Sequence, residues 1–406
     1  MKSFSYKKNK LFCEKVCIEE VCKKINTPFY LYSQKGILSN YKLLSNNLKN
    51  YNVLIAYAVK ANSNTAILRM LAKKGAGADV VSYGELTRAL KAGIPGNKIV
   101  FSGVGKNSKE IKYAIEKKIL LINAESKSEI LEIERISKSM NISTNIGIRL
   151  NPNTDAKTLN KISTGKKENK FGVTEKVFLE LVGYIKNSKN LNLKCLSVHI
   201  GSQILDYQPY KKMLSVVDKV IRKSNYKFDY IDLGGGMGIQ YNKEKKLNYK
   251  VYKKGIDILL RKYKSKIIFE PGRSIIGDAG LLITKVIYKK QTRNKDFIIL
   301  DSGMNDFMRP ALYGAKHRII PAVRVSKKSK KIYEFVGPIC ETTDKFLTLK
   351  NFQKLYENDI VIICDVGAYG MSLSSNYNLR PKPTELLING TKIKIIKKKQ
   401  KLKDII

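Results

Sequence analysis

Short apolar runs, most of them rich in β-branched residues, recur along the first two thirds of the chain and are separated by segments with helical periodicity. In one such segment Ile130, Ile133 and Ile136 fall on a single helical face. Eight strand–helix units match a (β/α)8 barrel, which typically takes about 250 residues. We therefore predict an α/β fold with a (β/α)8 TIM barrel over 34–278. The predicted strands are 53–59, 79–82, 98–102, 119–122, 146–150, 193–198, 230–233 and 266–269, and the clearest helices are 126–137, 174–185 and 210–221.

The pattern changes after about residue 280, where strand-like runs follow one another without strongly amphipathic helices between them. We predict a C-terminal all-β domain over 279–406. The apolar stretch 29–32 precedes the first barrel strand, so residues 1–33 are expected to add a strand to this β domain. The strands expected in the β domain are 281–288, 297–301, 318–323, 332–336, 359–365 and 386–396.

Polar residues stand where the predicted barrel strands end, which is the face on which such barrels carry their active sites. Ordinary caps and turns explain some of them individually. They do not explain a lysine, a histidine, three glycines and a Glu-Pro-Gly-Arg segment in the same layer. The strand-end residues are Lys60, Asp79, Ser102, Asn123, Asn151, His199, Gly234, Gly235, Gly236 and Glu270.

Lys60 directly follows the apolar run 53–59. A lysine at the end of a buried strand is a candidate for Schiff-base chemistry, because desolvation lowers the pKa of its amine and frees a nucleophile. The glycines 234–236 allow backbone N–H groups to approach a phosphate closely, although three glycines also make an ordinary turn. They are not a dinucleotide fingerprint, because residue 239 is isoleucine.

Composition and charge limit the classes of function that we expect for this chain. The formal net charge of +43 suggests polyanion binding, but the lysines are spread along the whole chain and form no patterned patch, so specific nucleic-acid binding is not expected. No run approaches the roughly 18 apolar residues of a membrane span, and the N-terminus has no apolar signal segment. None of the six cysteines forms a C-x-x-C pair or has zinc-like spacing, which favours free thiols, no metal site and a cytoplasmic location.

Five motifs together resemble the fold-type III pyridoxal-phosphate decarboxylases, and among them the diaminopimelate decarboxylases match best. The resemblance extends from 27–30 to 381–385. It implies the barrel and β domain of the alanine racemase and ornithine decarboxylase fold, pyridoxal 5'-phosphate as cofactor, and a homodimer whose active sites are completed across the subunit interface. The motifs are YAVKAN at 57–62, HIGSQ at 199–203, GGGMG at 234–238, EPGR at 270–273 and CETTD at 340–344.

The resemblance also implies a role for each matching residue in the barrel. Lys60 would hold the cofactor, His199 would stack on its ring, and Asp79 would support His199. Glu270 would pair with the pyridinium nitrogen and keep it protonated, which improves the electron sink. The alternatives to these roles are that Glu270 and Arg273 form an ion pair in a surface turn and that His199 caps a structural element. The other cofactor-binding positions would be Ser202, Gly235, Gly236 and Gly272.

The remaining matches concern the substrate. Arg273, which could also contact phosphate, is placed on the substrate together with Arg309 and Tyr313, although interface packing is open for the last two. Cys340 would donate the proton after carbon dioxide leaves, unless it is a buried small hydrophobe. Glu341 would bind the distal ammonium group of the substrate. Tyr369 would contact both cofactor phosphate and substrate.

These residues imply decarboxylation of meso-2,6-diaminopimelate to L-lysine, the last step of lysine biosynthesis. The substrate's far end carries an ammonium and a carboxylate, which calls for both a glutamate and arginines. The runner-up is an ornithine- or arginine-type decarboxylase of the same fold. A racemase lacks the C-E-x-x-D element, and a noncatalytic phosphate-cofactor carrier lacks the β domain. Family members often have a histidine in the segment that is 158–161 here, and this chain has none.

Overall fold

The computed structural model describes residues 3–156, 164–166, 168–242, 244–245 and 247–406, so the segment 158–161 lies outside the described residues. The chain forms two compact units, each with its own core. One comprises Lys42–Ile239 and Lys245–Gly272, and the other comprises Met1–Tyr41, Gln240–Glu244 and Arg273–Ile406. The domain limits expected from sequence stay a prediction.

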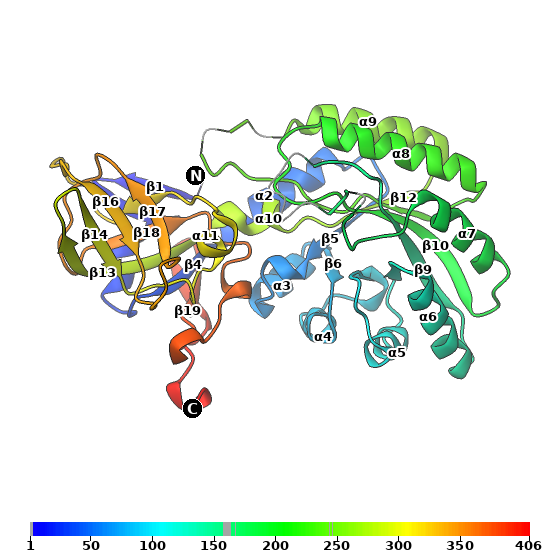
Figure 1. The fold of residues 1–406 in the computed structure, drawn as a ribbon, viewed down its shortest axis with the longest axis horizontal. Helices are drawn as coiled ribbons and strands as arrows, with labels where there is room; N and C mark the ends of the chain where they lie inside the picture. The colour runs from blue at the N-terminus through cyan, green and yellow to red at the C-terminus, as the bar shows by residue number, and fades with distance from the viewer. Residues whose placement is uncertain (1–2, 157–163, 167, 243, 246) are drawn as a thin grey trace. The chain divides into compact units, whose positions relative to one another are not determined.

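The first unit is a closed barrel of eight parallel strands, as predicted (Figure 1). The barrel closes where β12 pairs with β5. Each predicted strand is present, with its ends shifted by no more than about two residues. The strands are β5 (Val53–Ala58), β6 (Gly77–Val80), β7 (Ile99–Phe101), β8 (Leu121–Ala124), β9 (Thr144–Leu150), β10 (Leu191–Val198), β11 (Tyr230–Asp232) and β12 (Lys266–Phe269).

Helices follow the barrel strands and start at local capping residues. Ser82 and Ser126 accept a hydrogen bond from a backbone N–H in the first turn of the helix that follows each of them, and Asn107 forms a full capping box. These caps accept hydrogen bonds from N–H groups that have no acceptor within the helix. The helices are α3 (Thr65–Ala72), α4 (Tyr83–Lys91), α5 (Ser108–Glu116), α6 (Lys127–Ser139), α7 (Glu175–Lys186), α8 (Gln208–Ser224) and α9 (Tyr249–Tyr263).

The second unit is built mainly on a nine-stranded sheet. The N-terminal strand β4 (Phe29–Ser33) pairs antiparallel with β13 (Gly280–Gln291) and parallel with β19 (Thr384–Asn389), which confirms that the N-terminal segment contributes a strand. The other strands of this sheet are β14 (Lys295–Leu300), β15 (Ile319–Pro321), β16 (Ile332–Val336), β17 (Lys345–Leu349), β18 (Ile360–Cys364) and β20 (Lys392–Lys397).

Two features of this unit differ from the sequence prediction. The expected strand 386–396 is a hairpin of β19 and β20, because Gly390 and Thr391 form the turn and Gly390 has φ +61°. A separate small sheet is made by β1 (Phe4–Lys7), β2 (Lys10–Cys13) and β3 (Val16–Cys17), and these strands and β17 were not predicted. The unit's helices are α1 (Ile18–Cys22), the start of α2 (Gln34–Asn47), α10 (Arg273–Ile276) and α11 (Arg309–Tyr313).

In the described part of the chain, no helix is both long enough and apolar enough to cross a membrane. All six cysteines are free thiols, and Cys13, Cys195 and Cys364 are buried.

Candidate active site

Lys60 lies just after β5, in a short 3-10 turn, and its ammonium forms an ion pair with Asp79 on β6. Register explains the pairing, since Ala58 lies opposite Asp79 in the parallel ladder. The Asp79 side chain is fully buried, whereas that of Lys60 is 37% exposed. The Lys60 side chain is therefore paired with a buried carboxylate and is itself partly exposed. The resemblance had placed Asp79 beside His199, and the structure gives it Lys60 as a partner.

His199 follows β10, and its Nδ1 accepts a hydrogen bond from the backbone N–H of Gly235 at 3.1 Å. Burial lowers the pKa of His199 well below its usual range, and the charges of Arg149 and Lys60 lower it further. The imidazole is thus neutral, and its proton lies on Nε2 because Nδ1 is an acceptor. A neutral aromatic ring fixed in this way can stack on a flat ligand.

The glycine loop after β11 leaves no room for side chains. Gly234 and Gly236 have φ values of +63° and +87°, which favour glycine. A Cβ on Gly235 would lie 2.1 Å from the carbonyl oxygen of Glu270, and one on Gly236 would lie 2.5 Å from that of Gly201. The loop is therefore a bare backbone surface of the kind that cradles phosphate groups. Ser202 follows Gly201 directly in the sequence, and Gly272, two residues after Glu270, is buried.

Glu270 follows β12 and belongs to a buried polar network. Ser102 donates to its Oε1 at 3.3 Å, and Asn123 donates to both Ser102 and Asp232 at 3.3 and 3.1 Å. Burial, and then the charge of Asp232, raise the pKa of Glu270 well above its usual range, while burial raises that of Asp232 to about 6. A buried carboxyl in this state ionises when a cation comes beside it, which is the environment that a protonated ring nitrogen requires.

The barrel residues therefore fit pyridoxal phosphate. Lys60 would offer the amine, His199 a neutral ring face, the glycine loop a phosphate cradle, and Glu270 a partner for the ring nitrogen. Sequence reasoning missed Asp232, although its place two residues before the three glycines was visible. Ser102 and Asn123 were noticed only as polar residues at strand ends.

In the second unit, Arg273 and Arg309 lie together and are 5% and 4% exposed. Each donates an N–H to the hydroxyl of Tyr241, at 2.5 and 2.6 Å, and the guanidinium of Arg273 lies 4.9 Å from the centre of the Tyr369 ring. The structure thus brings together Arg273 and Arg309 at Tyr241, which sequence reasoning missed, and places Tyr369 beside Arg273. Tyr313 ends α11 and is half-buried, and among the described residues no hydrogen bond joins it to this cluster.

Cys340 and Glu341 are exposed, so the alternative of a buried Cys340 is wrong. Their loop is fixed by Asp344, whose carboxylate accepts hydrogen bonds from the backbone N–H groups of Ile339 and Met304 at 2.8 and 2.7 Å. Glu341 accepts a hydrogen bond from the Tyr377 hydroxyl at 2.6 Å. A rigid loop therefore presents a thiol and a carboxylate on the surface of this unit.

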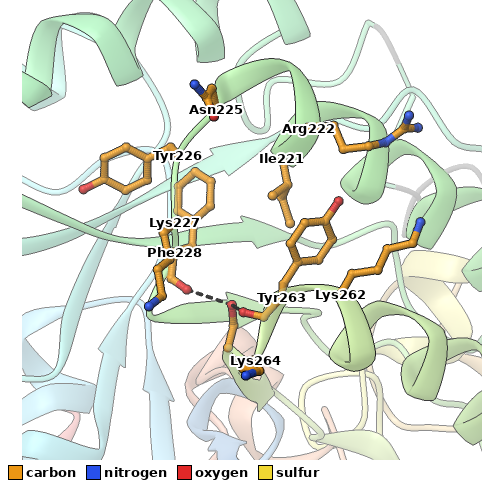
Figure 2. A pocket seen from close by; sticks show the side chains of 10 residues that line it. Ile221, Arg222, Asn225, Tyr226, Lys227, Phe228, Lys262, Tyr263 and Lys264 are labelled. Carbon is orange, nitrogen blue, oxygen red and sulfur yellow. Dashed lines mark hydrogen bonds between the residues drawn. The ribbon is translucent and has the colours of Figure 1, made fainter.

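One cavity of about 540 Å³ lies away from these residues, beside the starts of β11 and β12 (Figure 2). It therefore opens at the end of the barrel opposite to Lys60 and Glu270. Its cationic side chains are exposed, as expected in so lysine-rich a chain, and Lys262 is already paired with Asp218. None of the candidate site residues lines it. The lining residues are Ile221, Arg222, Asn225, Tyr226, Lys227, Phe228, Lys262, Tyr263, Lys264 and Ser265.

Comparisons with known proteins show the family to which the chain belongs. Residues 34–277 match the family described as "Pyridoxal-dependent decarboxylase, pyridoxal binding domain". A diaminopimelate decarboxylase of Helicobacter pylori strain J99 is 45% identical over 95% of this chain and 96% of its own length, and one of Aquifex aeolicus is 39% identical over 97% and 94%.

Solved structures give the same result. The Helicobacter pylori diaminopimelate decarboxylase complexed with L-lysine has a TM-score of 0.90 and 44% identity, covering 96% of this chain and 98% of its own. The M. jannaschii enzyme in complex with L-lysine has a TM-score of 0.93 and 35% identity, covering 99% and 96%. The chain therefore belongs to the diaminopimelate decarboxylases, within the family of pyridoxal-dependent decarboxylases.

Proposed function

We propose that the chain decarboxylates meso-2,6-diaminopimelate at its D-configured centre and yields L-lysine and carbon dioxide, the last step of lysine biosynthesis. The observation that carries the proposal is a lysine fixed by a buried carboxylate at the end of β5, in the same barrel as the glycine loop and Glu270. When bound, pyridoxal phosphate supplies the sink for the electron pair that the departing carboxylate leaves behind.

The barrel residues prepare this chemistry. Asp79 orients the Lys60 amine, which would hold the cofactor until a substrate amine takes its place. Glu270 would hold a proton at the cofactor's ring nitrogen by a charge-assisted hydrogen bond. His199 stays neutral, so its ring would pack against the cofactor without adding charge.

The substrate's carbon needs a proton once the carboxylate has left, and Cys340 or Lys60 supplies it. Glu341 binds the distal ammonium group, and Arg273 and Arg309 bind the distal carboxylate, with Tyr313 and Tyr369 beside the substrate. Two buried guanidinium groups disfavour a purely cationic substrate end. This argues against ornithine and arginine, the substrates of the runner-up function.

We further propose a homodimer with shared active sites. What supports it is the exposure of Cys340 and Glu341 on a fixed loop, where a second subunit can reach them. Mixing Lys60→Ala and Cys340→Ala subunits tests this idea. Random pairing makes about half of the dimers mixed, each with one intact site, so about a quarter of wild-type activity should return. No recovery in the mixture would rule out shared sites.

A cytoplasmic location completes the proposal, and the six free thiols support it, since disulfides are rare in reducing compartments.

The function is tested by supplying purified protein and pyridoxal phosphate with meso-diaminopimelate, ornithine or arginine in parallel reactions. Release of carbon dioxide from diaminopimelate, with L-lysine as the product, is expected. Turnover of ornithine or arginine alone would keep the cofactor site and overturn the substrate assignment. The Lys60→Ala protein is the control for cofactor chemistry in free solution.

A further inference from the structure

Tyr241 joins two buried cations through a single oxygen atom. Its hydroxyl accepts hydrogen bonds from Nη1 of Arg273 and Nη1 of Arg309, at 2.5 and 2.6 Å. The two guanidinium groups also lie 5.9 and 5.3 Å from the centre of its ring. Hydrogen bonds from charged donors are about twice as strong as neutral ones. The phenol oxygen therefore fixes the orientation of two side chains whose like charges repel each other.

Arg309 has unused capacity to bind an anion. It is 4% exposed, and in the described part of the chain it forms no ion pair and its Nε has no hydrogen-bond partner. A guanidinium group offers five N–H donors in a fork that matches a carboxylate. Burying such a charge without a counterion is unfavourable, and a bound carboxylate removes that cost.

His317, the second of the chain's two histidines, holds the Tyr241 ring in place. It is buried, and its ring meets those of Tyr241 and Phe307 edge-on, with centroids 4.8 and 4.7 Å apart. Its Nδ1 donates to the carbonyl of Cys364 at 2.9 Å, because a carbonyl oxygen can only accept. Tyr241 thus has a rigid support on one side and two cations at its hydroxyl.

We propose that Tyr241 is a positioning residue, which aligns Arg273 and Arg309 to bind the substrate carboxylate that the reaction leaves in place. This inference rests on the proposed function, because it takes that carboxylate to be the distal one of diaminopimelate, which L-lysine retains. Tyr241 acts through the two arginines and contacts no reacting atom. Its hydroxyl therefore determines how well ligands with this carboxylate bind. Binding of 1,5-diaminopentane, which has no carboxylate, does not depend on the Tyr241 hydroxyl.

The test is Tyr241→Phe, which removes one oxygen atom and leaves the ring under both guanidinium groups. Calorimetry on the cofactor-loaded protein measures affinity for L-lysine and for 1,5-diaminopentane. We expect affinity for L-lysine to fall about tenfold, or ~1.4 kcal/mol, and affinity for the diamine to stay within about twofold. Tyr252→Phe is the matched control, because Tyr252 is buried and, among the described residues, its hydroxyl has no hydrogen-bond partner.

Other outcomes contradict the inference in distinct ways. The positioning role is ruled out if Tyr241→Phe leaves L-lysine affinity unchanged or lowers affinity equally for both ligands. It is also ruled out if the variant no longer folds. A loss of pyridoxal phosphate affinity with an unchanged lysine-to-diamine ratio would assign the arginines to the cofactor phosphate. Because these measurements need no turnover, failure of the wild-type protein to decarboxylate diaminopimelate would count separately, against the proposed function.

Discussion

Adding a single methyl group to Gly235 should disable the site, because this residue lies against the backbone of Glu270. The new Cβ would lie 2.1 Å from the Glu270 carbonyl oxygen and 2.9 Å from its carbon, and real Cβ atoms essentially never come closer than 3.0 Å to other atoms. Both partners of the clash are parts of the backbone, so no side chain can rotate away. The glycine loop and the strand end must move apart by about 1 Å.

The size of the effect follows from this displacement. Overpacking of this kind costs about 1–3 kcal/mol of folding free energy. A misplacement of about 1 Å in a positioned group lowers catalysis on the order of 10²-fold. We therefore expect Gly235→Ala to lower the free energy of unfolding of the cofactor-free protein by about 1–3 kcal/mol and kcat/KM by about 10²-fold.

Gly183→Ala is the matched control. Gly183 lies in α7 and is exposed, and apart from neighbouring backbone of the same helix no atom lies within 4 Å of the position its Cβ would take. The same methyl group should raise the free energy of unfolding there by about 0.5–1 kcal/mol, because alanine favours helices more than glycine does. Urea unfolding and decarboxylation kinetics of both variants make the comparison. A Gly235→Ala enzyme with wild-type stability and kcat/KM would refute the reasoning about the cradle.

Three further predictions concern buried charges. Lys60→Ala removes the partner of buried Asp79 and should lower the free energy of unfolding by about 1–2 kcal/mol, less than for a fully buried pair because the Lys60 side chain is partly exposed. In urea unfolding, adding Asp79→Asn should restore part of this loss. An additive loss in the double variant would contradict the pairing. Burial raises the pKa of Asp306 to about 7, so between about pH 4 and 7 the folded state holds one more proton than the unfolded state. The free energy of unfolding therefore falls by up to ~1.4 kcal/mol for each pH unit as pH rises through that window. Asp306→Asn should flatten this dependence in urea unfolding at pH 5 and pH 7, and an unchanged slope would exclude Asp306 as its source. Asp232→Asn removes a charge that raises the pKa of Glu270, so infrared titration of the cofactor-free protein should show Glu270 ionising at lower pH; an unshifted titration would show that burial alone sets this pKa.

The barrel could be predicted because its signal is local. Each strand is a short apolar run, and each helix repeats its buried positions, such as Ile130, Ile133 and Ile136, within about two turns. Lys60 stood out for the same reason, since it directly follows such a run. The hairpin of β19 and β20 also had a local signal in Gly390, and it was overlooked because apolar residues resume soon after the turn.

Contacts between distant residues could not be predicted in this way. The pairing of Lys60 with Asp79 depends on the register of two strands. The carboxyl pair of Glu270 and Asp232 depends on how β11 and β12 lie side by side. Tyr241 carries no motif, and its importance emerges only when two arginines, 32 and 68 residues away in sequence, meet at its hydroxyl.

The most direct test of the account is to identify the lysine that carries the cofactor. Borohydride reduction of the loaded protein fixes pyridoxal phosphate to the amine that holds it, and peptide mass spectrometry locates the label. The account predicts one labelled position, Lys60, and no label there when meso-diaminopimelate has displaced the lysine before reduction. A label on a different lysine, or one at Lys60 that diaminopimelate does not displace, would contradict it.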